Sequence, residues 1–575
     1  MDQESTSRRI SSSTDLFPRS WLLMLYLATL LATAIVIPML FLGNASGHDF
    51  QQHLASWIET SGQWRQGIIF PRWAAGANYT FGEPRFIFYP PASWLLGGAL
   101  GSILSWRAVP GAYVWLMIVV ACMAMWKLAR DWLSPGLATV ASLLFGANPY
   151  FLTLVYYRSD FAELLVGALL PLLLWPTLRL LQCEWRRAPM LSLVFAGIWL
   201  SNAPAAVIAT YSLTLVLVIA TALRRELRIL ITGGLSMVAG FAVAAFYLIP
   251  AWWEQRWVRI GQAVSNTYNP ENNFLFTRSN DPEFIQFNWK ISTVAVVLIA
   301  LTAAGIAWSR TSSNKSRELW WIMVALSGAS VVLMLPPSAF LWRRLPELRF
   351  LQFPWRWLLL LSLPFAFFSA AAGHSRTWRV VIWTTLICVI FATGTAIAGD
   401  TAWDSEDTQK LVADIGAGRG YEGIEGFEPR GSSPDELDDT VPLIAEFDAA
   451  SGDINEPEES NITLRQWAAE NKSFDVKSNE PVTLVLRLLN YPAWEVEVDN
   501  KIVTTGTAPQ TGQILLQLPG GSHRVDLQFR VTGDRFIGMV ISSISIVLLI
   551  VVLVLLNGFR RWISPPSRNP RQAAL

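Results

Sequence analysis

The chain consists mainly of long apolar runs separated by short polar connections. Twelve of these runs are long enough, or nearly long enough, to cross a hydrocarbon core of about 30 Å as helices. They lie near 21–42, 109–128, 136–152, 161–181, 188–202, 204–222, 229–250, 291–309, 318–335, 354–373, 380–398 and 536–557. The pattern predicts a polytopic α-helical membrane protein with about twelve transmembrane helices.

A further apolar run, 87–104, opens with a Pro pair and contains several glycines. If it does not cross the membrane, every second connection carries Lys or Arg, as the positive-inside rule requires of cytoplasmic loops. These basic positions are Arg8 and Arg9, Lys127 and Arg130, Arg186 and Arg187, Arg224, Arg225 and Arg228, Arg310, Lys315 and Arg317, Arg376 and Arg379, and Arg560 and Arg561. We therefore expect 87–104 to lie on or dip into the outer face, with both termini in the cytoplasm.

The pattern changes between Asp400 and Asp534. The stretch 404–460 is acidic and poor in apolar residues, which indicates a mobile linker or lid, or alternatively a surface for a cation or substrate. Four runs with alternating apolar and polar residues follow, with hairpin turns expected at Asp499-Asn500 and Gly520-Gly521. This is the pattern of a β-sandwich.

The expected organisation follows from these segments. It comprises a cytoplasmic N-terminus (1–20), a transmembrane domain (21–399) with a first outer loop (43–108), an extracytoplasmic acidic linker with a β-rich domain (400–535), a last transmembrane helix (536–557) and a cytoplasmic tail (558–575). The run 21–42 is expected to be a retained first helix because no cleavage site clearly follows it.

The composition excludes several classes of protein and of site. Hydrophobic residues make up 52% and charged residues 15% of the chain, too little polar surface for a soluble globule, and membrane lipids are therefore the main expected surroundings. All three cysteines lie in or at the ends of apolar runs, which excludes a disulfide framework and a CxxC metal or redox motif. No nucleic-acid partner is expected.

The first outer loop carries a group of ionisable residues beside the first span. Asp49 lies just beyond that span, His48 and His53 flank it, and Arg72 and Arg85 follow in the same loop. A carboxylate there is placed to act as a general base on something presented from the membrane. Two alternatives are an ordinary N-cap of the helix that starts near Phe50 and a metal site formed by His48, Asp49 and His53, for which Mg or Mn is possible. No cofactor is certain.

Two further clusters lie at the same predicted face. Arg158, Asp160 and Glu163 stand at the outer end of a span, where they should face a cavity or one another unless they snorkel to the interface. A third cluster, Arg343, Arg344, Arg349 and Arg356, runs against the positive-inside trend. Outer arginines need anionic partners, either a lipid-linked phosphate or a carboxylate such as Glu347 or Glu163.

Several motifs give the chain a family resemblance. They are GHDFQQH, FPRW, FGEPRFIFYPP, RSDFAE, LSNAPA, LQFPWRW and the closing NYPAWEVEVDNKIV with LPGGSHRVDLQF, in this order along nearly the whole chain. Together they resemble the bacterial YfhO-like, 6-pyruvoyl-tetrahydropterin synthase-related integral membrane proteins of the GT-C glycosyltransferase superfamily.

This resemblance implies a GT-C-like fold, location in the bacterial inner membrane and transfer of a sugar from a polyprenyl-phosphate-linked donor to an extracytoplasmic acceptor. Asp49 matches the acidic residue at the reaction centre of that superfamily and would act as general base in an inverting transfer. Arg158, Arg349 and Arg356 would bind the donor phosphate. The expected groove residues are His48, His53, Arg72, Glu83, Tyr89, Asp160, Glu163 and Gln352.

Two other functions fit the same features. A transporter or flippase for lipid-linked glycans would also use outer arginines and intramembrane acids, although no internal inverted repeat and no pair of broken helices is evident in the sequence. A non-catalytic membrane protein whose β-domain binds cell-envelope glycans is the third possibility. The sequence does not identify the sugar, the acceptor or the oligomeric state.

Overall fold

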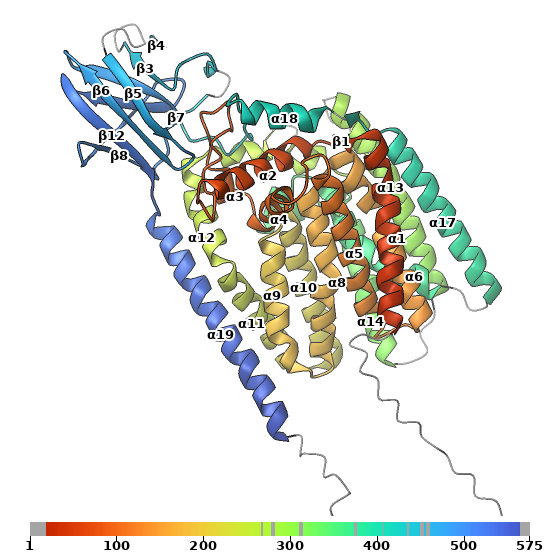
Figure 1. Ribbon diagram of the computed structural model, residues 1–575. Helices are drawn as coiled ribbons and strands as arrows, with labels where there is room; N and C mark the ends of the chain where they lie inside the picture. The colour runs from red at the N-terminus through yellow and green to blue at the C-terminus, as the bar shows by residue number, and fades with distance from the viewer. Residues whose placement is uncertain are drawn as a thin grey trace, which may run out of the picture.

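A computed structural model of the chain describes residues 19–265, 268–277, 282–309, 314–372, 376–404, 406–433, 436–448, 454–455 and 460–563. The predicted cytoplasmic segments before residue 19 and after residue 563 lie outside the described residues, and Arg8 and Arg9 lie there as well. The described chain forms a helical bundle, a cap of short elements at one end of it, and a β-domain beside that cap (Figure 1). The end of the bundle that carries the cap is called the domain end here.

Long apolar helices build the bundle, as the sequence predicts. The long helices are α1 (Arg19–Leu42), α5 (Val109–Ala129), α8 (Phe161–Leu181), α10 (Ala203–Arg224), α13 (Pro282–Trp308), α16 (Leu358–Ala371), α17 (Arg376–Gly399) and α19 (Gly533–Ile563). Shorter ones are α6 (Pro135–Gly146), α7 (Pro149–Thr153), the π-helical turn η1 (Leu154–Arg158), α9 (Ala188–Trp199), α11 (Leu227–Val243), α12 (Ala245–Glu254), α14 (Asn314–Leu333) and α15 (Ala339–Arg344). Within the described ranges, nine helices are long and apolar enough to cross a membrane, or eleven if two bent pairs count as spans.

The sequence predicts twelve spans and the structure has at most eleven among the described residues, because the run 188–202 does not form one. Its helix α9 has 12 residues, about 18 Å, which is too short to cross alone. It ends because Asn202 already caps α10 by accepting a hydrogen bond from the Ala205 backbone N–H. The C-terminal end of α9 meets α4 (Pro91–Gly101), where the Ala92 N–H donates to the Leu200 carbonyl at 2.7 Å. Helix α4, with 11 residues, is likewise too short to cross, as expected for 87–104.

The expectation that no helix pair is broken was wrong. Helix α11 and the segment from Ala245 to Trp257 meet at 72°, and the segments Arg317–Leu333 and Pro336–Arg344 meet at 90°. The second bend follows from the Pro336-Pro337 pair, because proline lacks the N–H that would continue the helix.

The cap consists of α2 (Phe50–Arg65), α3 (Arg85–Phe88), α4 and α18 (Asp407–Gly416), which lie across the domain end (Figure 1). Antiparallel pairing of β1 (Asn44–Ala45) with β2 (Trp403–Asp404) joins the chain just before α2 to the chain just before α18. Part of the stretch expected to be a mobile linker is therefore packed, and Tyr421 within it is only 3% exposed.

Two five-stranded antiparallel sheets face each other in the β-domain, which confirms the predicted β-sandwich. In sheet order, one contains β10 (Gly506–Thr507), β11 (Gln513–Leu518), β7 (Val482–Leu489), β3 (Ile444–Phe447) and β4 (Ile454–Asn455). The other contains β5 (Ser460–Trp467), β6 (Asn471–Ser478), β12 (Gly521–Phe529), β8 (Trp494–Val498) and β9 (Lys501–Val503).

Only one of the two predicted hairpin turns is present. Asp499 and Asn500, both with positive φ, link β8 to β9 in the two-residue turn that this backbone geometry favours. The Gly520-Gly521 prediction was wrong, because β11 and β12 belong to different sheets and the glycines carry the chain across between them. Glycine is needed there because a Cβ on Gly520 would lie 2.7 Å from the Asn479 carbonyl oxygen.

The β-domain is joined to the bundle by shared core residues and by buried charges. Trp73 of the first loop packs on Tyr491, Trp494 and Phe529 of the sandwich. At the start of α19, Arg535 donates to both carboxylate oxygens of the fully buried Glu254, at 2.6 and 2.7 Å, and Tyr491 donates to the same group. Removal of one partner from a buried ion pair costs about 3–5 kcal/mol because it leaves the other charge uncompensated.

We therefore expect Arg535→Ala to lower the apparent melting temperature of the full-length protein in detergent and to speed proteolysis of the β-domain. Arg530→Ala is the matched control, because Arg530 is half-exposed and pairs with Glu495 at the surface, where an ion pair contributes about 0–1 kcal/mol. Equal melting temperatures for the two variants would contradict the anchoring role of the Glu254 pair.

Candidate functional site

Five charged side chains meet at the domain end of the bundle. Asp49 precedes α2, Arg158 ends the π-helical turn η1, and Asp160 and Glu163 begin α8, whereas Arg356 lies in the short 3-10 helix η9 (Pro354–Trp357). These five residues are called the Arg158 cluster here. Asp49 lies 109 residues before Arg158 in the chain, so folding brings the two together.

Arg158 is the centre of the cluster. Its Nη2 lies 2.5 Å from Asp49 Oδ2 and 3.1 Å from Asp160 Oδ2, and its Nη1 lies 3.2 Å from Glu163 Oε2. Its side chain is only 4% exposed. The three acidic and basic residues of the RSDFAE motif therefore face one another, and the snorkelling alternative does not describe them.

Arg356 closes the cluster from the other side. Its Nε lies 3.2 Å from Glu163 Oε2, its Nη2 lies 3.8 Å from Asp160 Oδ2, and its Nη1 donates to the Leu351 carbonyl at 2.9 Å. Tyr150 donates to the remaining Glu163 oxygen at 2.5 Å. Glu163 is thereby held by two guanidinium groups and a phenol, with no exposed surface.

The carboxylates differ in their access to solvent. The exposed side-chain fraction is 26% for Asp49, 4% for Asp160 and zero for Glu163. Burial raises the pKa of Asp160, but the adjacent Arg158 guanidinium outweighs it and holds that pKa well below its usual range. Asp49 is thus the accessible carboxylate of a cluster whose other members are buried.

The backbone explains how Asp49 is held against Arg158. The Asp49 N–H donates to the Arg158 carbonyl at 2.8 Å, and the Ser159 hydroxyl bridges the Ala45 carbonyl and the Gly47 N–H. Ser159 itself adopts the left-handed conformation, with φ 52°, where η1 turns into α8. A Cβ on Gly47 would lie 2.5–2.7 Å from the backbone of Tyr157, Arg158 and Ser159, so only glycine allows this approach.

The two alternatives for Asp49 can be compared with this geometry. Asp49 does occupy the N-cap position of α2, but its side chain makes no capping hydrogen bond. The metal set does not fit either: His53 Nε2 lies 3.7 Å from Asp160 Oδ1, whereas the His48 ring packs on Phe287 with 4.6 Å between centroids. In the part of the chain that the structure describes, no group of three or more His, Cys, Asp or Glu side chains is arranged to hold a metal ion.

Aromatic rings surround the cluster. Arg158 lies over the rings of Trp355 and Phe353, at 5.1 and 5.7 Å, and Tyr268 contacts Phe353. Tyr89 Oη lies 3.4 Å from His53 Nε2, and burial, followed by the nearby Asp160 and Asp49 charges, raises the pKa of this tyrosine well above its ordinary value. The sequence analysis assigned His53 and Tyr89 to the site, but neither Phe353 nor Trp355.

The remaining predicted site residues do not all lie at the Arg158 cluster. Gln352 is beside the cluster, with its Oε1 3.5 Å from Arg356 Nη1. Arg349, in the 3-10 helix η8 (Leu348–Leu351), is exposed, and no ion pair within 4 Å joins it to the described residues. Arg72 and Glu83 lie elsewhere.

Arg72 and Glu83 take part in the attachment of the cap. Arg72 Nε donates to Glu470 of the β-domain at 3.1 Å. Glu83 accepts from Arg85 Nε at 2.6 Å and from the Ile424 N–H at 3.0 Å. The sequence does not reveal these attachments because Glu470 and Ile424 are remote in the chain from Arg72 and Glu83.

No curated protein matches the sequence. Among solved structures, a mutant of the arabinofuranosyltransferase AftD from Mycobacteria is 14% identical with a TM-score of 0.44; the match covers 91% of this chain and 60% of that one, so this chain spans less than two thirds of its length. ArnT from Cupriavidus metallidurans, bound to undecaprenyl phosphate, is 13% identical with a TM-score of 0.29, covering 61% of this chain and 77% of that one.

The family assignment rests on a sequence match instead. Residues 86–401 match the 6-pyruvoyl-tetrahydropterin synthase related domain, described as a membrane protein. The matched segment contains four of the five residues of the Arg158 cluster and most of the bundle. Since this segment is more than half of the chain, the protein belongs to the 6-pyruvoyl-tetrahydropterin synthase related family of membrane proteins.

Proposed function

We propose that this protein is an inverting membrane glycosyltransferase that moves a sugar from a polyprenyl-phosphate-linked donor to an extracytoplasmic acceptor, with Asp49 as general base. The observation that carries the proposal is the single accessible carboxylate of the Arg158 cluster, at the domain end of the bundle. The family resemblance of the surrounding motifs supports it. The protein would reside in the bacterial inner membrane with the domain end outside.

The contacts of Asp49 are compatible with the role of general base. Arg158 occupies Oδ2, and no hydrogen bond among the described residues uses Oδ1. Oδ1 would take the proton of the acceptor hydroxyl as that oxygen attacks the anomeric carbon. The bond from this carbon to the phosphate oxygen breaks on the opposite face, the polyprenyl phosphate leaves with the electron pair, and the configuration inverts. Arg158 orients the carboxylate through its contact with Oδ2.

The departing phosphate needs a cation, and the Arg158 cluster has little positive charge to offer. Its two arginines already face three carboxylates. The exposed Arg349 precedes Arg356 by seven residues and reaches no carboxylate within 4 Å among the described residues. We therefore assign the first contact with the donor phosphate to Arg349, and an orienting role to Arg158 and Arg356.

Aromatic rings beside the cluster suit a sugar. Phe353 and Trp355 stack with 4.9 Å between centroids, and Phe287 and Tyr268 pack against this pair. Apolar ring faces bind the C–H faces of pyranose or furanose rings, while the adjacent charges bind hydroxyls. This arrangement would hold the transferred sugar between Asp49 and the phosphate.

A lipid-linked-glycan translocator is the second candidate. Its supporting observation is the two bent helix pairs, at 72° and 90°, because broken helices form substrate sites in many transporters. The two candidates differ in whether a glycosidic bond forms, which can be measured directly.

Asp49→Asn should lower the rate of sugar transfer by at least about 100-fold, since an amide cannot accept the acceptor proton. The measurement uses full-length protein in proteoliposomes with radiolabelled polyprenyl-phosphate sugars and acceptors extracted from the host envelope. Asp131→Asn is the control, because Asp131 also pairs with an arginine, Arg179 at 2.6 Å, but follows α5 at the opposite end of the bundle.

The outcomes separate the candidates. Transfer by Asp49→Asn at the wild-type rate would remove Asp49 as the base. Movement of the lipid-linked sugar across the bilayer by the wild-type protein, with no sugar transferred, would replace the transferase by the translocator.

Gly47→Ala should reduce transfer strongly while the protein still folds, because the added methyl would push the loop away from Arg158 and displace Asp49. Gly62→Ala in α2 is the matched control, since no atom lies within 4 Å of its Cβ position. The rate of transfer and the apparent melting temperature are measured for both variants. Full activity in Gly47→Ala would mean that the Asp49 position is not critical.

Arg349→Gln should raise KM for the lipid-linked donor about tenfold or more and change kcat less, because the first contact with the phosphate is lost. Arg344→Gln, another exposed arginine of the same segment, serves as the control. Steady-state kinetics at several donor concentrations give the two parameters. Equal KM values for the two variants would place the donor phosphate elsewhere.

A further inference from the structure

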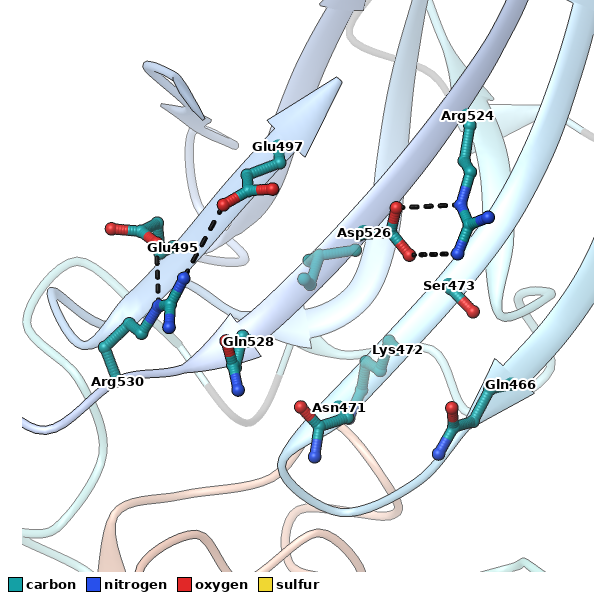
Figure 2. A pocket seen from close by; sticks show the side chains of 11 residues that line it. Gln466, Asn471, Lys472, Ser473, Glu495, Glu497, Arg524, Asp526, Gln528 and Arg530 are labelled. Carbon is teal, nitrogen blue, oxygen red and sulfur yellow. Dashed lines mark hydrogen bonds and ion pairs between the residues drawn. The ribbon is translucent and has the colours of Figure 1, made fainter. Parts of the chain in front are cut away.

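An open cavity of about 380 Å³ lies on the β-domain, away from the Arg158 cluster. It is formed on the sheet that contains β5, β6, β12, β8 and β9, on the face opposite the sandwich core (Figure 2). The alternation along β12 explains it: Val525, Leu527 and Phe529 are buried, whereas the residues between them turn outward into the cavity. This cavity is called the sheet groove here.

The charged side chains that line the sheet groove interact with one another. Arg524 donates to both oxygens of Asp526, at 2.9 and 3.2 Å. Arg530 lies 2.7 Å from Glu495 and 3.6 Å from Glu497. The Lys472 ammonium is turned away from the groove toward the Ala468 carbonyl, at 2.9 Å, and packs over the Trp494 ring. Because Lys472 is turned away, three carboxylates and two guanidiniums face the groove, which gives its lining a small excess of negative charge.

Neutral polar groups make up most of the remaining lining. They are the side-chain amides of Gln466, Asn471 and Gln528 and the hydroxyl of Ser473, which project into the groove (Figure 2). No hydrogen bond within the described part of the chain uses these side chains, so each can still donate and accept. The paired carboxylates and guanidiniums add fixed acceptors and donors beside them.

These features select one class of ligand. An anionic polymer or a phosphate would be repelled by the excess negative charge of the lining, and an apolar ligand would desolvate the amides without compensation. A saccharide has uncharged hydroxyls that donate and accept at once, which is what amides and paired charged groups satisfy. The volume lies within the range of about 300–1,000 Å³ of small-molecule sites. We propose that the sheet groove binds a neutral glycan, in addition to the transfer site.

The sheet groove is connected to the Arg158 cluster through helix α2. Glu470, next to Asn471, holds Arg72 of the first loop, and the Ala469 N–H donates to Gln66 Oε1 at 3.1 Å, directly after α2 ends. Helix α2 begins after Asp49 and has 16 residues, about 24 Å. One rigid helix therefore connects Asp49 to the groove, and a glycan of several sugar units bound there is within reach of the transfer site.

The test measures glycan binding by the full-length protein in detergent. Saturation-transfer NMR and calorimetry use neutral tetrasaccharides of glucose, mannose, galactose and arabinose, with a sulfated heparin tetrasaccharide as the charged comparison. At least one neutral tetrasaccharide should bind, and Asn471→Ala/Gln528→Ala should weaken it about tenfold or more because two hydrogen-bonding amides are lost. Lys477→Ala, exposed near the other end of β6 and outside the groove, should leave binding unchanged.

Binding does not depend on Asp49, so the Asp49→Asn variant should bind the same tetrasaccharide as the wild type even where it transfers no sugar. Melting temperatures of all variants establish that each is folded. Absence of binding by all four neutral tetrasaccharides, tighter binding of the sulfated one, or equal affinity in the double variant would each overturn the proposal.

Discussion

The burial of the Arg158 guanidinium is the constraint on which the domain end of the bundle depends. An unpaired ion in such a position would cost several kcal/mol, so the fold must bring carboxylates to it. Asp160 and Glu163 follow Arg158 closely in the chain, but Asp49 comes from the first loop. The close approach of Gly47 to the backbone of residues 157–159 and the left-handed Ser159 are the local consequences. The ion pairs therefore join the loop to the bundle and place Asp49 at the same time.

The same constraint separates the roles of charged groups in the proposed reaction. In the Arg158 cluster three carboxylates face two guanidiniums. The two guanidiniums are therefore already compensated by carboxylates, which disfavours a phosphate in direct contact with the cluster. On the proposed function, a separate cation such as Arg349 would keep the phosphate away from the base, and the sugar would lie between them.

Much of this arrangement could be predicted from the sequence, because charged residues next to apolar runs are conspicuous. All five residues of the Arg158 cluster were recognised in this way. Pairing of Arg158 with its neighbours and of Arg356 with Glu163 was one of the alternatives. The pairing of Asp49 with Arg158 was not considered, since it depends on how segments remote in sequence pack. Tyr150 and Phe353 lie among apolar residues, where a ring that lines a site has the same pattern as one in the core. Tertiary packing also determines the bends between helices and the passage of Gly520-Gly521 between two sheets. The alternation of apolar and polar residues along the chain does not reveal such features.

Arg72 shows how the β-domain changes the interpretation of the first loop. In the sequence it is one more cation near Asp49; in the structure it binds Glu470, and Trp73 beside it enters the sandwich core. The loop after α2 is therefore part of the β-domain attachment, whereas the residues at the start of α2 belong to the Arg158 cluster. Because α2 is a continuous helix with its two ends held by different partners, movement of the β-domain must also move the chain that carries Asp49. On the two proposals together, α2 sets the distance between the bound part of a glycan and the base, so the number of sugar units that fit between them would be a property of the fold.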